Sequence, residues 1–232
     1  MYKKFCPGPL TFVLKLKKKS KISKFVTNNK KTLAIRFPKQ RLVRKLIKNL
    51  DYPLAAPSAN ISTKLSSVKA ADVKEEFGKK IKFVLDGGKC KIGIESTIIN
   101  LTRKPEILRL GGLENSKIKK VLKKQLIINI NPSKKNAPGQ SKLHYSPGIP
   151  LRMNALKSKK DEAYISLKKK NNKNKDFFYL SKNGNLSEAA KNLYSILRKV
   201  KKKGYKSIAI EKIINYGIGQ TINDRLSRAS KK

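Results

Sequence analysis

Residues 53–60 place two polar side chains directly after a predicted strand. The segment reads Pro-Leu-Ala-Ala-Pro-Ser-Ala-Asn, and residues 54–56 can continue a buried strand. Pro57 ends it because proline has no N–H to donate. Ser58 and Asn60 therefore follow at the carboxyl end of a strand, where open α/β sheets bind their ligands. They can hold a small polar molecule, although an ordinary strand-to-loop transition is the simpler interpretation of this segment alone.

Two arginines stand at the ends of other predicted strands. Arg36 is in the strand predicted over residues 33–37, and Arg109 is near the end of the one over residues 107–110. A guanidinium is a planar fork that suits a carboxylate or a phosphate. The alternative is an arginine paired with a surface carboxylate, which only 14 acidic residues make less common here.

Hydroxyl groups and one histidine complete the candidates. Ser96 and Thr97 start a predicted strand, where they can bind a polar ligand or, more commonly, satisfy backbone groups. His144, the sole histidine, precedes Tyr145. A single histidine is more often structural than catalytic, and no Ser-His-Asp triad can be assembled. A tyrosine in an extended segment can cover a ligand and exclude water.

Strand and helix patterns alternate along the first half of the chain, which indicates an α/β fold. Apolar runs rich in β-branched residues predict strands over residues 11–16, 33–37, 82–85, 96–101 and 107–110. Amphipathic spacing and capping residues predict helices over residues 40–50, 67–76 and 115–124.

A segment rich in proline and glycine separates two predicted domains. Residues 129–150 contain four prolines, which is typical of a stiff, extended connection that can itself be functional. Beyond it, strands are predicted over residues 163–167, 177–180 and 207–210, with helices over 187–203 and 221–229. These elements predict a second, small α/β domain.

Composition limits the class of protein. The chain has 232 residues, with 57 Lys and Arg against 14 Asp and Glu, so its formal charge is +43. Such a field attracts polyanions such as RNA or nucleoside triphosphates, but lysines on solvated faces are an equally good explanation. Cys6 and Cys90 are the only cysteines, so neither a disulfide framework nor a zinc site is predicted. No signal peptide, apolar span or Walker-type loop is present, and we expect a cytoplasmic protein with no membrane partner.

Taken in order, these segments resemble the YrdC-type domain. The resemblance rests on residues 5–11 (Phe-Cys-Pro-Gly-Pro-Leu-Thr), 34–38 (Ala-Ile-Arg-Phe-Pro), 53–60, 85–88 (Leu-Asp-Gly-Gly), 93–98 (Gly-Ile-Glu-Ser-Thr-Ile) and 107–111 (Ile-Leu-Arg-Leu-Gly). Residues 138–147, which include His144 and Tyr145, and residues 217–226 are similar to the second half of two-domain threonylcarbamoyl-AMP synthases. Each motif is weak alone, but the ordered set is specific and covers nearly the whole chain.

This resemblance implies an architecture. It implies a twisted open YrdC-type sheet with helices, incomplete at its amino-terminal side, and a small Rossmann-like α/β domain at the carboxyl end. The implied boundaries are residues 1–128 for the catalytic domain, 129–150 for a linker that covers the active site and 151–232 for the second domain.

The resemblance also implies a reaction. Family members join L-threonine, bicarbonate or CO2, and ATP into threonylcarbamoyl-AMP and pyrophosphate, for the threonylcarbamoyladenosine modification of tRNA. The implied enzyme is a nucleotidyltransferase that uses Mg²⁺ with ATP and works with tRNA or with downstream tRNA-modification proteins. Catalysis would come from positioning and charge stabilisation, with no side chain as acid, base or nucleophile and no metal held by the protein alone.

Site residues follow position by position from the family pattern. Arg36 would hold the threonine carboxylate, and Ala56 and Ser96 would line the threonine pocket. The residues implied to contact ATP are Thr32, Ser58, Asn60, Ser66, Arg109 and Tyr145.

The sequence departs from the family at its beginning. Family members carry a Pro-Thr-Glu-Thr-like loop and a Lys-x-Arg motif before the segment that matches residues 5–11, and neither is present here. The resemblance thus implies an amino-terminally truncated synthase. A non-catalytic, basic RNA-binding remnant of the same fold is the main alternative, and carbamoyl transfer to another acceptor is a third.

We therefore expect the 232-residue chain alone to make little or no threonylcarbamoyl-AMP. The measurement is pyrophosphate release from ATP that depends on both threonine and bicarbonate. A normal rate from the pure chain would contradict this expectation.

Overall fold

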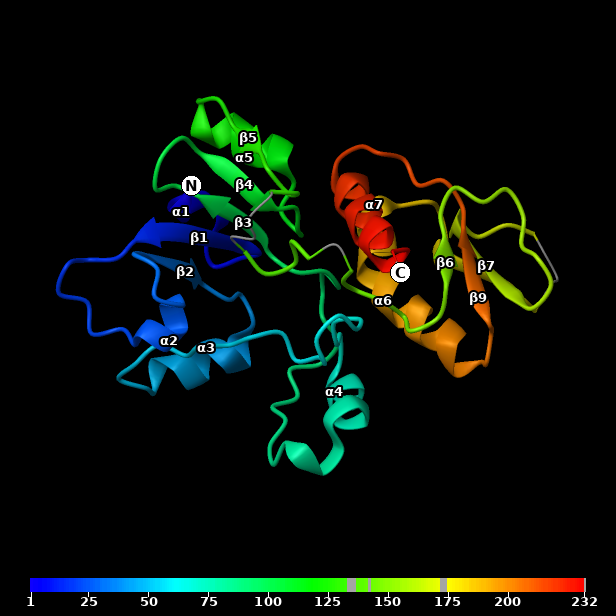
Figure 1. The fold of residues 1–232 in the computed structure, drawn as a ribbon, viewed down its shortest axis with the longest axis horizontal. Helices are drawn as coiled ribbons and strands as arrows, with labels where there is room; N and C mark the ends of the chain where they lie inside the picture. Colours follow the sequence, from blue (N-terminus) through cyan, green and yellow to red (C-terminus); the bar gives the residue numbers. More distant parts are fainter. Residues whose placement is uncertain (133–136, 142, 172–174, 232) are drawn as a thin grey trace. The chain divides into compact units, whose positions relative to one another are not determined.

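The computed structural model describes residues 1–132, 137–141, 143–171 and 175–231. The chain divides into two compact units. Unit 1 consists of Met1–Pro57 and Glu95–Gln140, and unit 2 consists of Ser58–Ile94 and Ser141–Lys232. Each unit is built on one β-sheet with helices (Figure 1). The predicted α/β class is confirmed.

Unit 1 contains a five-stranded mixed sheet in the order β2-β1-β3-β4-β5. Strand β1 pairs antiparallel with β2 and parallel with β3, while β4 pairs antiparallel with β3 and parallel with β5. The bounds are Leu10–Lys15, Thr32–Arg36, Thr97–Asn100, Glu106–Arg109 and Ile127–Ile128 for β1 to β5. The first four strands were predicted to within two residues. Strand β5 was missed because two residues carry no recognisable alternation.

Alternate apolar residues of this sheet form the core of unit 1. Leu10 and Phe12 of β1 pack with Ile99 of β3 and Ile107 of β4, and Ile118 of helix α5 covers them. The four helices of the described part of unit 1 are α1 (Tyr2–Phe5), α2 (Lys24–Thr27), α3 (Arg41–Lys48) and α5 (Asn115–Leu122). Helices α3 and α5 were predicted, whereas the single-turn helices α1 and α2 are too short to show a helical period.

Unit 2 contains a parallel four-stranded sheet in the order β6-β9-β7-β8. Its strands are β6 (Leu151–Arg152), β7 (Glu162–Lys168), β8 (Phe177–Ser181) and β9 (Ser207–Ile210), and its long helices are α6 (Leu186–Lys202) and α7 (Ile218–Ala229). Ile165 and Ile208 pack with Leu193 and Leu197 of α6 in one apolar cluster. Tyr164, which points to the other face of the sheet, belongs to a separate small cluster. This sheet confirms the Rossmann-like second domain.

A segment before β3 packs with unit 2. It carries helix α4 (Ala70–Phe77) and the 3₁₀ turn Gly78–Lys80. The helix was predicted to start at Ser67, but the Ser67 hydroxyl instead donates to the carbonyl of Ala59 at 2.7 Å. Asp72 caps the helix, because its carboxylate accepts the N–H groups of Val68 and Lys69.

Two predicted strands are absent from the described residues. Residues 54–56 and 82–85 have no strand partner, and Leu54 and Phe83 are exposed rather than buried. A run of apolar residues becomes a strand only where another strand satisfies its backbone, and the prolines that flank residues 54–56 donate no hydrogen bond. The expected buried strand before Ser58 was therefore wrong, and Ser58 follows an exposed extended segment.

The predicted domain boundaries stay a prediction. Of the predicted linker, residues 133–136 and 142 lie outside the described residues, as do 172–174 and 232 of the predicted second domain. No helix in the described part of the chain has the length and the apolar character that a membrane span requires.

A glycine lets β3 and β4 meet, and its replacement should destabilise unit 1. A Cβ at Gly111 would lie 2.2 Å from the backbone nitrogen of Thr97 and 2.3 Å from the carbonyl carbon of Ser96. Backbone atoms cannot yield as a side chain can, so we expect Gly111→Ala to lower the free energy of unfolding by about 3 kcal/mol. Gly88→Ala is the control, because it adds only backbone strain in open space. Equal losses in chemical denaturation would contradict this account.

A buried carboxylate should give unit 2 an acid-dependent stability. Burial would raise the pKa of Glu162, but hydrogen bonds from Arg152, at 2.9 and 2.6 Å, and from the Lys159 amide outweigh it and hold the pKa below its ordinary value. Because the pKa of Glu162 is lower in the folded state, its ionised form stabilises the folded protein at pH values above the unfolded pKa of about 4.3. This stabilisation is lost as the pH falls through the folded-state pKa.

We therefore expect Glu162→Gln to destabilise the protein by about 2 kcal/mol at neutral pH. The difference from wild type should shrink as denaturation is repeated at pH values below about 4. A difference that stays constant across this range would show that the charge of Glu162 is not responsible.

Candidate functional site

Three side chains meet at one end of the sheet of unit 1. Thr11 lies on β1, Ser96 directly precedes β3 and Arg109 ends β4. The Ser96 Oγ is 2.7 Å from the Thr11 Oγ1 and accepts a 3.1 Å hydrogen bond from Arg109 Nη2. Arg109 Nε also donates to the Ser96 carbonyl oxygen at 3.1 Å. The serine is thus held from both sides.

Arg36 extends this group onto the neighbouring strand. It ends β2 directly opposite Thr11 in the antiparallel register, so the two side chains project from the same face of the sheet. Its Nε donates to the Gly8 carbonyl at 3.4 Å, and Gly8 N–H donates to the Phe37 carbonyl at 2.8 Å. The loop before β1 is therefore tied to the end of β2. We call Arg36, Thr11, Ser96 and Arg109 the Ser96 row.

The neighbour of Ser96 has a structural role. Thr97 is fully buried, and its hydroxyl donates to the Leu113 carbonyl at 2.5 Å and accepts the Leu113 N–H at 3.1 Å. Of the two hydroxyls considered from the sequence, one satisfies backbone groups and the other joins the Ser96 row. Successive side chains of an extended chain point to opposite faces, so the side chains of Ser96 and Thr97 point in different directions.

The Ser96 row suits the carboxylate of a small amino acid. Arg36 is exposed at the sheet end, and a guanidinium there can bind a carboxylate in a bidentate manner. Ser96 and Thr11 offer hydroxyls beside it, of the kind that a polar amino-acid side chain would meet. Sequence reasoning singled out Arg36, Ser96 and Arg109 but missed Thr11, which ends the Pro-Gly-Pro-Leu-Thr segment and could have been found there.

Cys6 is the one cysteine in the loop that precedes β1. Burial raises the pKa of its thiol above the ordinary value, and the nearby amino terminus offsets this only in part. A raised pKa favours the unreactive thiol over the thiolate.

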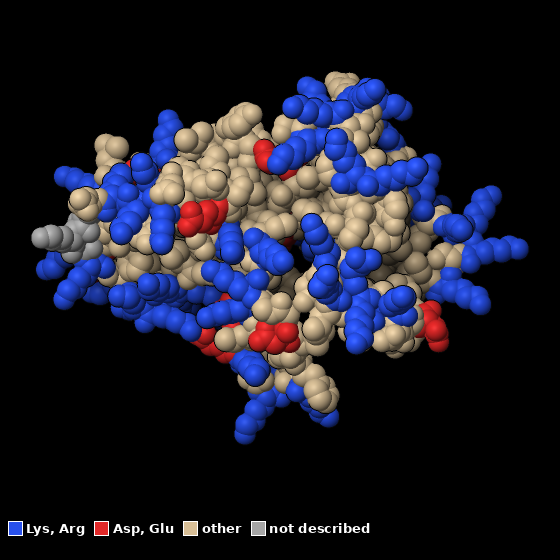
Figure 2. Space-filling view, turned by 180° about the vertical axis from the view of Figure 1, so that it is seen from behind, with Lys and Arg blue, Asp and Glu red and all other residues tan. Residues whose placement is uncertain are grey.

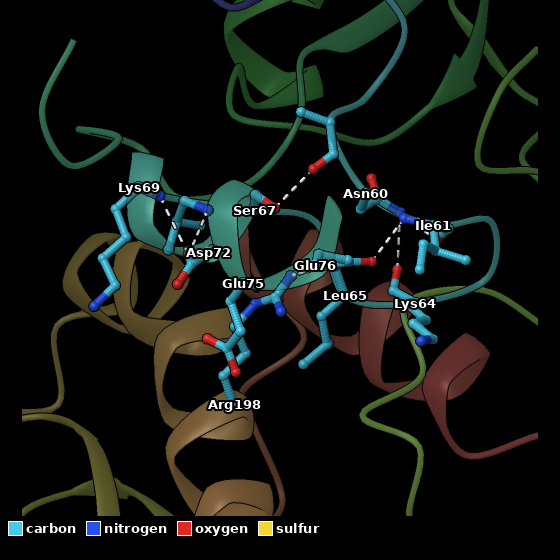
Figure 3. Close-up of polar contacts among 12 residues, drawn as sticks. Asn60, Ile61, Lys64, Leu65, Ser67, Lys69, Asp72, Glu75, Glu76 and Arg198 are labelled. Carbon is cyan, nitrogen blue, oxygen red and sulfur yellow. Dashed lines mark hydrogen bonds and ion pairs between the residues drawn. The ribbon is translucent and has the colours of Figure 1, made fainter. Parts of the chain in front are cut away.

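A second group of predicted residues, Ser58, Asn60 and Ser66, lies in unit 2. Asn60 Nδ2 donates to the carbonyls of Ile61 at 2.9 Å and Lys64 at 3.2 Å, which closes the turn (Figure 3). Its Oδ1 is buried and has no hydrogen-bond donor among the described residues. Ser58 is exposed and Ser66 is half-buried.

Tyr145 is buried within unit 2. Its side chain is 1% exposed, the guanidinium carbon of Arg225 lies 4.7 Å from its ring centroid, and Tyr194 stacks on it at 5.8 Å. Arg225 pairs with Asp224, which also accepts a 3.0 Å hydrogen bond from Arg228. The motif over residues 217–226 thus forms a buried charge cluster against Tyr145. Contact between Tyr145 and a nucleotide stays a prediction.

The two remaining predicted residues, Thr32 and Ala56, are not part of the Ser96 row. Thr32 begins β2, four residues from Arg36, which corresponds to about 13 Å along the strand. Ala56 belongs to the exposed segment before Ser58 and is in no strand. The predicted roles of Thr32 in ATP binding and of Ala56 in threonine binding are untested.

The described residues contain no group of three or more His, Cys, Asp or Glu side chains that could hold a metal ion. In nucleotide-binding sites, Mg²⁺ is usually bound by the phosphates of the nucleotide and keeps several water ligands. We therefore assign no residue of the chain to Mg²⁺.

Comparison with known proteins gives the family. A family model described as telomere recombination matches residues 1–111, and one described as the threonylcarbamoyl-AMP synthase C-terminal domain matches residues 113–231. The threonylcarbamoyl-AMP synthase of Pyrococcus abyssi is 34% identical over 98% of this chain, and that of Schizosaccharomyces pombe is 31% identical over 99%. This chain spans 72% of the first protein and 65% of the second.

A solved structure supports the same conclusion. The crystal structure of P. abyssi Sua5 complexed with L-threonine matches 99% of this chain and 72% of its own length, with a TM-score of 0.86 and 32% identity. Sequence and fold agree over both units, and the family predicted from the sequence is confirmed. The chain belongs to the threonylcarbamoyl-AMP synthase family, with the YrdC-type domain followed by the C-terminal domain of these synthases.

Proposed function

We propose that this chain takes part in the formation of threonylcarbamoyl-AMP and pyrophosphate from L-threonine, bicarbonate or CO2, and ATP. The Ser96 row carries the proposal, because it gathers two guanidinium groups and two hydroxyls at one end of one sheet. The relative with 32% identity binds L-threonine. Threonine is therefore the first substrate that the proposal assigns to the Ser96 row.

The chemistry needs positioning more than proton transfer. The threonine amine attacks CO2, and a C–N bond forms as the amine loses a proton. A carbamate oxygen then attacks the α-phosphorus of ATP, and the bond to the bridging oxygen breaks to release pyrophosphate. Every reactant in the second step is anionic, so fixed positive charge lowers its barrier. Arg36 would hold the threonine carboxylate, and Arg109 fixes the hydroxyl of Ser96 beside it.

The nucleotide is assigned to residues of the loop in unit 2. Ser58, Asn60 and Ser66 would contact ATP, and the buried Oδ1 of Asn60 is an acceptor without a donor among the described residues. Mg²⁺ would enter with the phosphates of ATP. Its role there is to offset their charge.

The product would serve the threonylcarbamoyladenosine modification of tRNA in the cytoplasm. The comparisons do not favour the alternative of a non-catalytic RNA-binding protein, because the second half matches the synthase C-terminal domain and the relatives that match nearly the whole chain are named threonylcarbamoyl-AMP synthases. Figure 2 shows lysines and arginines spread over most of the face drawn rather than gathered in one patch. A generally basic, solvated surface shows such a spread, and the spread does not single out a dedicated RNA site.

Arginine replacement tests the threonine site. We expect Arg36→Ala to weaken L-threonine binding at least about tenfold, since a bidentate carboxylate contact contributes more than about 1.4 kcal/mol. Arg103→Ala is the matched control. Arg103 is exposed in the turn between β3 and β4, at the opposite end of these two strands from Ser96 and Arg109. Isothermal calorimetry measures both. Wild-type affinity in Arg36→Ala would remove Arg36 from the site and the main support of the proposal.

A further inference from the structure

Residues 58–66, which we call the nucleotide loop, cannot hold their shape through secondary structure. They form no helix or strand, apart from a single bridge between Lys64 and Ser146, and most of them are exposed. A loop of this kind is ordered only by contacts with the elements around it. These contacts therefore decide where its polar groups lie.

Helix α4 holds the middle of the nucleotide loop. The backbone N–H of Ile61 donates to Glu76 Oε1 at 2.6 Å. The other oxygen of this carboxylate accepts a hydrogen bond from Arg198 Nη2 at 3.1 Å (Figure 3). Both oxygens of Glu76 are thus engaged, one by the loop and one by helix α6.

Helix α6 holds the end of the same loop. Arg198 Nη2 also donates to the carbonyl of Leu65 at 2.6 Å. Leu65 is 3% exposed and packs in the apolar cluster to which α6 contributes Leu193 and Leu197. One guanidinium therefore connects Leu65, near the end of the loop, to the carboxylate that accepts the Ile61 N–H (Figure 3).

Burial makes this connection strong. The side chains of Glu76 and Arg198 are 6% and 17% exposed, so water screens their attraction poorly. Loss of either partner leaves the other charge buried without compensation. The pair Lys202–Glu75 joins the same two helices, but its side chains are 59% and 51% exposed, where an ion pair contributes little.

From these contacts we infer that Arg198 and Glu76 are positioning residues for ATP, through which helix α6 of the C-terminal domain sets the conformation of the nucleotide loop. The inference rests on the proposed function, because that function assigns ATP to Ser58, Asn60 and Ser66. The proposed function assigns no substrate contact to Arg198 itself. Threonine is assigned to unit 1, so we expect its affinity not to depend on this pair.

The test uses the full chain with Arg198→Ala and Glu76→Gln, and Lys202→Ala as the matched control. Amide hydrogen exchange without nucleotide should accelerate at residues 61–66 by at least about tenfold in the first two variants and not in the control. The dissociation constant for ATP should rise roughly tenfold, while that for L-threonine stays unchanged. Arg198→Lys, which keeps the charge but loses the planar fork, should be intermediate.

The outcomes separate the two claims. Wild-type exchange rates at residues 61–66 in both variants would overturn the positioning role, and so would unchanged ATP affinity in variants that bind ATP. Equal weakening of threonine and ATP would also overturn it, because that is the signature of a general loss of structure. If the wild-type chain bound no ATP, the proposed function would fail, and exchange alone would decide whether Arg198 positions the loop.

Discussion

The hydroxyl of Ser96 is the point on which the candidate site depends. It lies between Thr11 of β1 and Arg109 of β4, and it can reach both because Gly111 leaves no side chain against the backbone at Ser96 and Thr97. The parallel pairing of β1 with β3 and the antiparallel pairing of β3 with β4 bring these residues to one sheet end. Arg36 joins them through the register of β2, so the row is a consequence of strand pairing.

Among the ion pairs of the described residues, the most buried carboxylates are paired with arginine. Three carboxylates that are less than a tenth exposed, Glu76, Glu162 and Asp224, pair with arginines. Within the described part of the chain, the lysine pairs involve carboxylates that are at least 23% exposed, such as Glu114, Glu75 and Asp161. A guanidinium is weakly hydrated and donates in two directions, which suits a buried carboxylate better than an ammonium does. With 14 acids against 57 bases, most lysines remain on solvated faces.

The sequence predicted much of the fold and three of the four residues of the Ser96 row, whose role in binding stays a prediction. Period and composition located β1 to β4, helices α3 and α5, and the alternation of the second domain, because these elements bury one face each. They failed over residues 54–56 and 82–85, where an apolar pattern has no partner strand among the described residues. Arg36, Ser96 and Arg109 were found from residue type and resemblance. Thr11, Glu76 and Arg198 were not, because their roles depend on partners up to 133 positions away in the chain.

By itself, the sequence determined the α/β class, the family and the residue types available for binding anions, since these follow from local pattern and ordered motifs. Only the tertiary structure decided which of those residues meet. It placed the Ser96 row at one sheet end of unit 1 and buried Tyr145 against Arg225 in unit 2. It also tied residues 58–66 to helix α6. The physical reason is that hydrogen bonds and buried ion pairs act over a few ångströms in space, whereas a sequence pattern reports only what neighbours along the chain prefer.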